Sequence, residues 1–182
     1  ENEMCSVRPE LCDHENGNEA AKEFWRTYCN IDHFVYLSLT SGVKVGITRH
    51  YNIPDRWIDQ GAVKGLIIAK VPERILSGKI ETAVSKNFAD KTNWRKMLKS
   101  EYEDLDLLEY REKAHELFPE DLKCYALENE GIQELVYPVE SVPEKITSHN
   151  LDKNPEFEDR LTGIKGQYLI FETRVINIRK YS

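Results

Sequence analysis

The sequence has no apolar run approaching the roughly 20 residues that a bilayer-spanning helix needs. It also has no recognisable secretory signal peptide. These two absences argue against a membrane partner and favour a protein of the reducing cytoplasm. The 182 residues are 40% hydrophobic and 31% charged, a balance typical of a globular chain that can bury a core.

An excess of basic residues is missing too, because 25 Lys and Arg stand against 32 Asp and Glu and the formal net charge is −7. Non-specific nucleic-acid binders are normally basic, since their affinity depends on neutralising phosphates. The overall charge therefore argues against bulk DNA binding. A local nucleic-acid site stays compatible with it, because acidic residues concentrate in 101–121 while 44–56 and 91–99 are locally basic.

The sequence motifs that are typical of common catalytic sites are absent as well. There is no P-loop, no G-x-G-x-x-G, no H-E-x-x-H and no serine nucleophile elbow, and no spacing supports a cysteine–histidine nucleophile. This excludes the usual nucleotide-binding, zincin and α/β-hydrolase signatures. Any active site must therefore be assembled from dispersed residues.

Cysteine is scarce, and three of the four cysteines fall within residues 1–33, a segment with nothing like a core of its own. Its potential metal donors are Cys5, Cys12, His14, Cys29 and His33. In a reducing compartment clustered thiols indicate a metal rather than disulfides.

Zn²⁺ held by three thiolates and one imidazole would keep such a segment folded. We assign the ligands as Cys5, Cys12, Cys29 and His33. Their spacing, Cys-x6-Cys-x16-Cys-x3-His, is not that of a standard zinc finger. The alternative is that these residues are free thiols packed against the aromatic side chains of Phe24 and Trp25.

Residues 34–99 carry the patterns of an α/β core in the order β-β-α-β-α. Apolar residues alternate in 35–39 and 43–47 around the turn residues Thr40-Ser41-Gly42, which predicts a β-hairpin. A helix is expected from Asn52, with Pro54 in its first turn and Gly61 as its C-cap. The apolar run 65–71 predicts a covered strand, and Pro72 opens a second helix.

Three polar residues lie on this scaffold where their side chains can converge: Tyr36 in the first strand, Arg56 in the first helix and Glu81 in the second. Tyr36 is expected on the less buried face of its strand. A phenol, a guanidinium and one carboxylate together can orient water, hold a phosphate and bind one Mg²⁺ or Mn²⁺. The alternative is an ordinary strand aromatic and two solvated helix residues.

The order VY, VKVG, a helix arginine and a later glutamate resembles the GIY-YIG nuclease fold over residues 34–95. This resemblance implies that Tyr36 helps to activate the attacking water, that Arg56 contacts the scissile phosphate and that Glu81 is the single metal ligand. Two departures stand out. Phe34 replaces the first glycine of the motif, and Lys44 replaces its second tyrosine.

The same resemblance implies further substrate contacts. Gly46 matches the glycine of the second half-motif, where a missing side chain lets a phosphate approach. Asn93 matches a late structural asparagine. Apart from the resemblance, Lys44 and Arg49 of the locally basic stretch 44–56 are candidates for substrate binding. The implied activity is a metal-dependent phosphodiesterase or endonuclease acting on nucleic acid. The alternative is a catalytically inactive module of the same fold that binds nucleic acid or a protein.

A second resemblance runs along the whole chain. The strings GVKVGITR, RWIDQGA, DKTNWRKML and GIKGQYLIF are similar to those of an uncharacterised bacterial family, a domain of unknown function. The resemblance to that family implies no particular activity.

The second half of the chain changes in character. Residues 100–118 predict an acidic amphipathic helix that ends before Pro119, within a segment 100–122. Residues 123–182 predict a small antiparallel β-unit packed on the sheet, with strands in YAL, ELVYPV, KGQYLIF and RVINIRK. The sequence thus predicts an α+β protein with an N-terminal Cys/His segment (1–33), a GIY-YIG-like core and a C-terminal β-unit.

Overall fold

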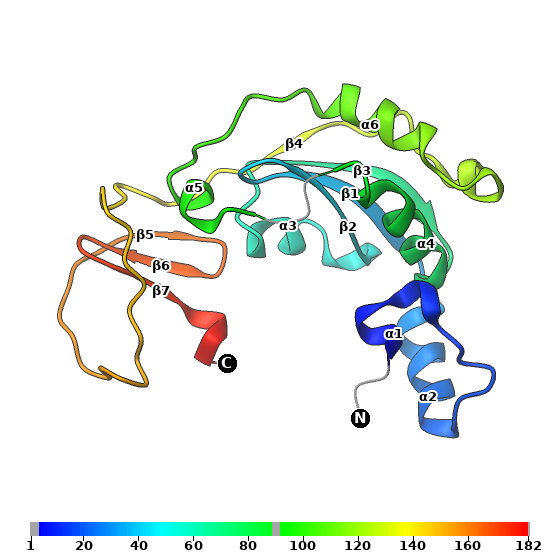
Figure 1. The fold of residues 1–182 in the computed structure, drawn as a ribbon, viewed down its shortest axis with the longest axis horizontal. Coiled ribbons are helices and arrows are strands. Elements are labelled where there is room, and N and C mark those ends of the chain that lie inside the picture. The colour runs from blue at the N-terminus through cyan, green and yellow to red at the C-terminus, as the bar shows by residue number, and fades with distance from the viewer. Residues whose placement is uncertain (1–3, 89–91, 182) are drawn as a thin grey trace.

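The computed structural model describes residues 4–88 and 92–181, and its architecture is mixed α+β with two antiparallel sheets. The molecule is an arch, with the larger sheet in the middle, the N-terminal helices at one end and the smaller sheet at the other (Figure 1). The larger sheet has the strand order β2-β1-β3-β4 and the smaller one β5-β6-β7.

The helices and strands are α1 (Met4–Val7), α2 (Glu19–Phe24), β1 (His33–Leu39), β2 (Val43–Arg49), α3 (Asp55–Asp59), β3 (Lys64–Val71), α4 (Arg74–Ser85), α5 (Trp94–Leu98), α6 (Leu107–Glu116), β4 (Gln133–Glu134), β5 (Leu161–Lys165), β6 (Tyr168–Phe171) and β7 (Val175–Asn177). A 3-10 helix at Pro9–Leu11 and a π-helical turn at Trp25–Cys29 complete the N-terminal segment. The order from β1 to α4 is the predicted β-β-α-β-α.

The central strand β1 pairs antiparallel with β2 on one side and with β3 on the other. Its alternation divides the sheet into two faces. Val35 and Leu37 belong to the main core, which also contains residues of α4 and α6. Tyr36 points the other way, toward α3, where it joins a separate buried cluster with Trp57. Figure 1 shows α6 and α3 on opposite sides of the sheet.

The expectation that Tyr36 lies on a less buried face is wrong, because its side chain is only 1% exposed. The Trp57 indole packs edge-on against the Tyr36 ring with the centroids 5.9 Å apart and covers this second face. A Cβ on Gly46, the residue paired with Tyr36, would lie 2.6 Å from the tyrosine hydroxyl oxygen. The missing side chain of Gly46 therefore makes room for the tyrosine and leaves no open approach for a phosphate.

Three predicted helices are shorter than expected. Helix α3 spans five residues with Pro54 at its N-cap, whereas Asn52 lies in a preceding 3-10 turn. Helix α4 begins at Arg74 rather than at Pro72. Residues 101–106 are not helical, because the Asp106 side chain accepts a hydrogen bond from the Leu108 N–H and caps α6 there. Gly61 follows α3 with φ +69°, as a C-cap glycine does.

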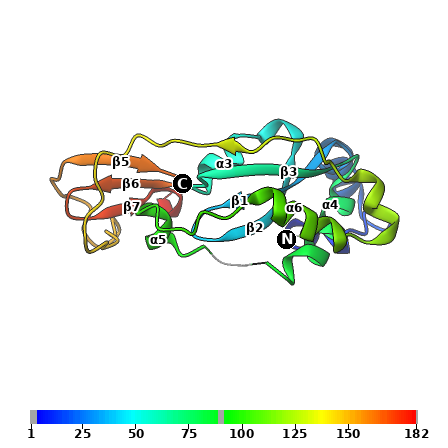
Figure 2. The ribbon, with the colours of Figure 1, turned by 90° about the horizontal axis from the view of Figure 1, so that it is seen from above.

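The C-terminal β-unit is smaller than predicted and packs mainly on α5. Residues 125–127 contribute only an isolated bridge to β3, and β4 includes only the first residue of the predicted strand 134–139. The buried cluster of this end combines Met97 and Leu98 of α5 with Ile170 and Val175. Viewed from above, α5 lies beside β7, at the end of the smaller sheet that is nearest the larger sheet (Figure 2).

A buried lysine sets the pH dependence of this unit. Lys165 is 2% exposed, and its ammonium donates a hydrogen bond to the Ser100 hydroxyl at 2.7 Å. Burial lowers its pKa from 10.5 to about 8. Because the folded state releases this proton before the unfolded state does, the free energy of unfolding rises as pH increases from 8 to 10.5.

We expect Lys165→Met to raise the free energy of unfolding by about 1–2 kcal/mol at pH 7, because no charge then needs to be desolvated. The difference in the free energy of unfolding between Lys165→Met and the wild type should shrink between pH 8 and pH 10, as the wild-type lysine becomes neutral. Urea denaturation at several pH values measures both effects. The matched control Lys153→Met, at an exposed position, should change little. A destabilised Met variant at pH 7 would contradict the expectation.

Candidate functional site

A cavity of about 370 Å³ opens beside the Arg49 end of β2 and is lined by arginines from three separate elements. Arg49 ends β2, Arg56 lies in α3 and Arg74 begins α4. The remaining lining residues are Phe24, His33, Ile47, Thr48 and Asn52. Among the residues that the structure describes, none of those lining the cavity is acidic. Guanidinium groups bind phosphate and carboxylate in a bidentate manner, so this cavity is suited to an anion.

Arg49 is held in place by the N-terminal segment. Its Nε donates a hydrogen bond to the Tyr28 carbonyl at 3.3 Å, and its guanidinium lies 4.9 Å from the centroid of the Tyr28 ring. His33 is buried in the same wall, with Nδ1 2.7 Å from the Ile31 carbonyl oxygen. Burial and the nearby arginines lower the pKa of His33, which favours a neutral imidazole.

Tyr36 is oriented by Gln60. The Gln60 amide donates a hydrogen bond to the Tyr36 hydroxyl oxygen at 3.0 Å, and its carbonyl accepts one from Ser38 at 3.4 Å. Burial raises the pKa of Tyr36, with Arg56 and Gln60 opposing that rise. The phenol therefore keeps its proton at neutral pH, so it can donate a hydrogen bond but does not serve as a base.

Glu81 lies on α4 seven residues after Arg74, and so about two turns further along the same side of the helix. Its side chain is half-buried. Burial, and then the carboxylate of Glu10, raise the pKa of Glu81 to about 7, while Arg56 and Arg74 oppose the rise. Arg56 thus acts on the pKa of both Tyr36 and Glu81. The phenol, the guanidinium and the carboxylate therefore lie close enough to influence one another's ionisation.

Two of the expected substrate contacts lie elsewhere. The Asn93 side chain caps α5 by accepting hydrogen bonds from the backbone of Arg95 and Lys96, and its own N–H donates to Ser41. That places it at the far end of β1, roughly 20 Å from His33. Lys44 shares the Tyr36 face of the sheet through its pairing with Ser38, but it does not line the arginine cavity.

The metal ligands need separate tests. Within residues 4–88 and 92–181, no group of three or more His, Cys, Asp or Glu side chains is arranged to hold a metal ion. Mg²⁺ needs no such cage, because it keeps several waters and takes one or two carboxylates together with substrate phosphates. Glu81, with Glu10 near enough to raise its pKa, fits that requirement. His33 does not fit the expected zinc set, since it lines the arginine cavity instead.

Sequence reasoning did not single out Arg74, Glu10 or Gln60 as site residues. Nothing in the local spacing marks Arg74 or Glu10. Arg74 lines the cavity because α4 packs beside β2, and Glu10 lies near Glu81 because the 3-10 helix Pro9–Leu11 packs against Gly78 of α4. The short distance from Arg56 to Gln60 along α3 was the one available signal for Gln60.

The fold and these side chains define a mixed α+β protein with an anion-attracting cavity beside a Tyr–Arg–Glu group. The chain belongs to the family described as Protein of unknown function (DUF2797), whose sequence model matches residues 1–182. This confirms the resemblance to a domain-of-unknown-function family along the whole chain. No curated protein and no solved structure matches it. Of the helices in the described residues, none has the length and apolar character to cross a membrane.

Proposed function

We propose that this protein is a metal-dependent phosphodiesterase that acts on nucleic acid through a GIY-YIG-like site. The observation that carries the proposal is the position of Arg56. It lines a cavity with two further arginines and at the same time opposes the burial-driven rise in the pKa of Tyr36 and of Glu81. A phosphate in the cavity would therefore meet a guanidinium that also acts electrostatically on the Tyr36 phenol and the Glu81 carboxylate.

Each residue has a distinct role in this proposal. Arg56, with Arg49 and Arg74, binds the phosphate and offsets the negative charge that develops on it. The protonated Tyr36 hydroxyl positions the attacking water by a hydrogen bond. Glu81 holds Mg²⁺ or Mn²⁺, which when bound supplies Lewis acidity and lowers the pKa of a coordinated water.

The net charge of −7 fits a local site better than a long nucleic-acid groove. Affinity would come from a few phosphates at the arginine cavity rather than from an extended basic surface. We therefore expect a shallow dependence of binding on salt, with a slope set by about two or three neutralised phosphates.

A binding module without turnover is the second candidate function, and two observations favour it. Tyr36 is almost fully buried with a raised pKa, which leaves it little access to an attacking water. Lys44 stands where the nuclease motif has its second tyrosine. Such a module would still bind phosphates through the three arginines.

The test is cleavage of labelled single-stranded DNA, duplex DNA and RNA with Mg²⁺ or Mn²⁺, with EDTA as the blank. We expect Arg56→Ala to lower the cleavage rate about 100-fold or more, because a charged donor on the reacting phosphate is lost. The matched control Arg160→Ala, which removes an exposed arginine ion-paired with Glu140, should cleave normally.

The two candidate functions give different results in the same assay. Wild-type binding that Arg56→Ala weakens, without cleavage under any metal, would replace the phosphodiesterase by the binding module. Neither binding nor cleavage by the wild type would contradict both.

A further inference from the structure

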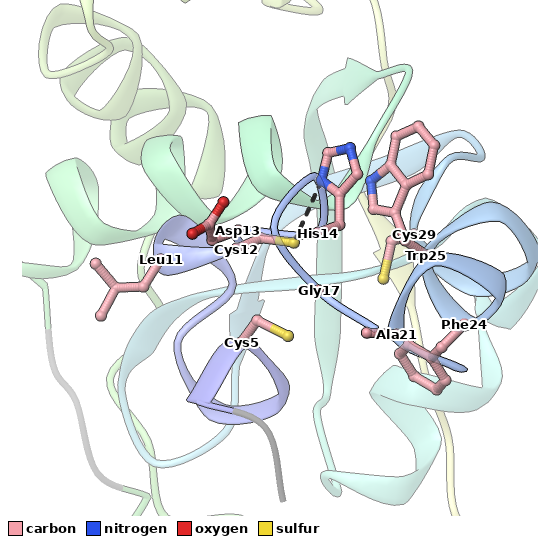
Figure 3. Close-up of a pocket in the computed structure, with 10 residues that line it drawn as sticks. All are labelled: Cys5, Leu11, Cys12, Asp13, His14, Gly17, Ala21, Phe24, Trp25 and Cys29. Carbon is pink, nitrogen blue, oxygen red and sulfur yellow. Dashed lines mark hydrogen bonds between the residues drawn. The ribbon is translucent and has the colours of Figure 1, made fainter. Parts of the chain in front are cut away.

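A second cavity, of about 200 Å³, lies in the N-terminal segment and is lined by three cysteines and one histidine. The four donors come from separate elements: Cys5 from α1, Cys12 and His14 from the loop after the 3-10 helix, and Cys29 from the end of the π-helical turn. Figure 3 shows the three sulfur atoms and the His14 ring disposed around one space. Such a convergence of soft donors is typical of a zinc site.

One distance already matches such a site. Cys12 Sγ and His14 Nδ1 are 3.8 Å apart. Two donors of one tetrahedral zinc, with bonds of about 2.3 Å to sulfur and 2.0–2.1 Å to nitrogen, lie about 3.6 Å apart. The His14 ring is held in this direction by the Trp25 indole, which stacks on it with the centroids 3.9 Å apart.

The thiols also influence one another. Burial raises the pKa of Cys12, and Cys5 and Cys29 add to that rise. Burial also raises the pKa of Cys29. The electrostatic influence of Cys5 and Cys29 on Cys12, and of Cys5 on Cys29, shows that the three thiols lie close to one another.

We infer that this cavity is a structural zinc site whose ligands are Cys5, Cys12, His14 and Cys29. His14 takes the place that the sequence suggested for His33, because His33 does not line this cavity. Among the described residues these donors do not stand in a coordinating arrangement, so their side chains would have to move closer together to hold zinc. The inference does not depend on the proposed phosphodiesterase activity.

In this fold the N-terminal segment needs a bound metal for its stability. Within the described residues, the buried apolar clusters contain no residue before Val35. The segment docks through Pro9, whose ring fills the space over Gly78 of α4. A zinc ion joining its three elements supplies the stabilisation that an apolar core would otherwise give.

The site also borders the arginine cavity. Arg74 lines both the arginine cavity and a small space shared with Cys5, Cys12 and Cys29, and it opposes the burial-driven rise in the pKa of the Cys29 thiol. Bound zinc would therefore fix the side of the arginine cavity that carries Arg74. It would also fix Tyr28, which holds Arg49 in place.

The experiment uses the full chain, stripped of metal under reducing conditions and titrated with Co²⁺ and then Zn²⁺. We expect one equivalent of Co²⁺ with the intense thiolate-to-metal absorption of a tetrahedral sulfur-rich site, displacement by Zn²⁺ and a rise in melting temperature. His14→Ala and Cys29→Ser should each weaken metal binding tenfold or more.

Two variants keep the ligand assignment testable even if the cysteine variants fold poorly. His33→Gln and Cys124→Ser should each retain one equivalent of Zn²⁺ with the wild-type Co²⁺ spectrum. Wild-type protein that binds no metal, or binds it without thiolate absorption, would overturn the inference. Loss of binding in His33→Gln with full binding in His14→Ala would overturn the assignment of His14.

Discussion

Replacing Glu81 by glutamine should abolish phosphodiester cleavage, with a loss of about 1,000-fold or more, while the fold survives. The side chain keeps its size, but a neutral amide cannot hold a divalent cation in place of the carboxylate. The initial rate of cleavage at saturating metal measures the loss. Circular dichroism and urea denaturation measure whether the fold persists.

The stability change has a predictable sign because the pKa of Glu81 is raised from 4.5 to about 7 in the folded protein. Between these two pH values the folded state binds more protons than the unfolded state, so the free energy of unfolding falls as pH rises through this window. Glu81→Gln removes this pH-dependent loss of stability, because the glutamine side chain does not titrate. The variant should therefore match the wild type near pH 5 and exceed it in stability at pH 8.

The same pKa gives a kinetic signature. At limiting metal, wild-type cleavage should rise as pH increases through 7, because ionised Glu81 is the form that holds the cation. The control Glu109→Gln, on the exposed side of α6, should follow the wild type in both rate and stability. A fully active Glu81→Gln enzyme would remove Glu81 from the site.

The fold could be predicted from sequence where local pattern decides it. Alternation in 35–39 and 43–47 gave the hairpin, its two faces and the direction of Tyr36, because the side-chain period of a strand is set by the backbone. The burial of Tyr36 could not be predicted in that way. It depends on Trp57, which arrives from a five-residue helix that periodicity cannot define.

The candidate site, like the fold, could be predicted from the sequence only in part. The sequence order placed Tyr36, Arg56 and Glu81 on elements from which Arg56 influences the pKa of the other two side chains. The third arginine of the cavity, Arg74, depends on how α4 packs beside β2, and the proposed zinc donor His14 depends on how the N-terminal segment folds. No spacing within one element reports such a contact, so the sequence favoured His33 because it follows Cys29 closely.

The closest packing beneath the site predicts the largest stability effect. A Cβ added to Gly65 of β3 would lie 2.4–2.6 Å from ring atoms of Trp57, a side chain that is 1% exposed. The indole is rigid and enclosed, so it cannot move aside without moving α3. We expect Gly65→Ala to lower the free energy of unfolding by about 3 kcal/mol and the melting temperature by about 10 °C.

Because α3 also carries Arg56 and Gln60, the same substitution should impair phosphate binding even at temperatures where the protein stays folded. Gly131→Ala is the matched control, since a Cβ there would meet nothing within 4 Å. In a double-mutant cycle, Trp57→Leu should cost less in the Gly65→Ala background than alone, because the smaller side chain relieves the clash. Additive losses would show that Gly65 and Trp57 act independently, and that the position of α3 is set by other contacts.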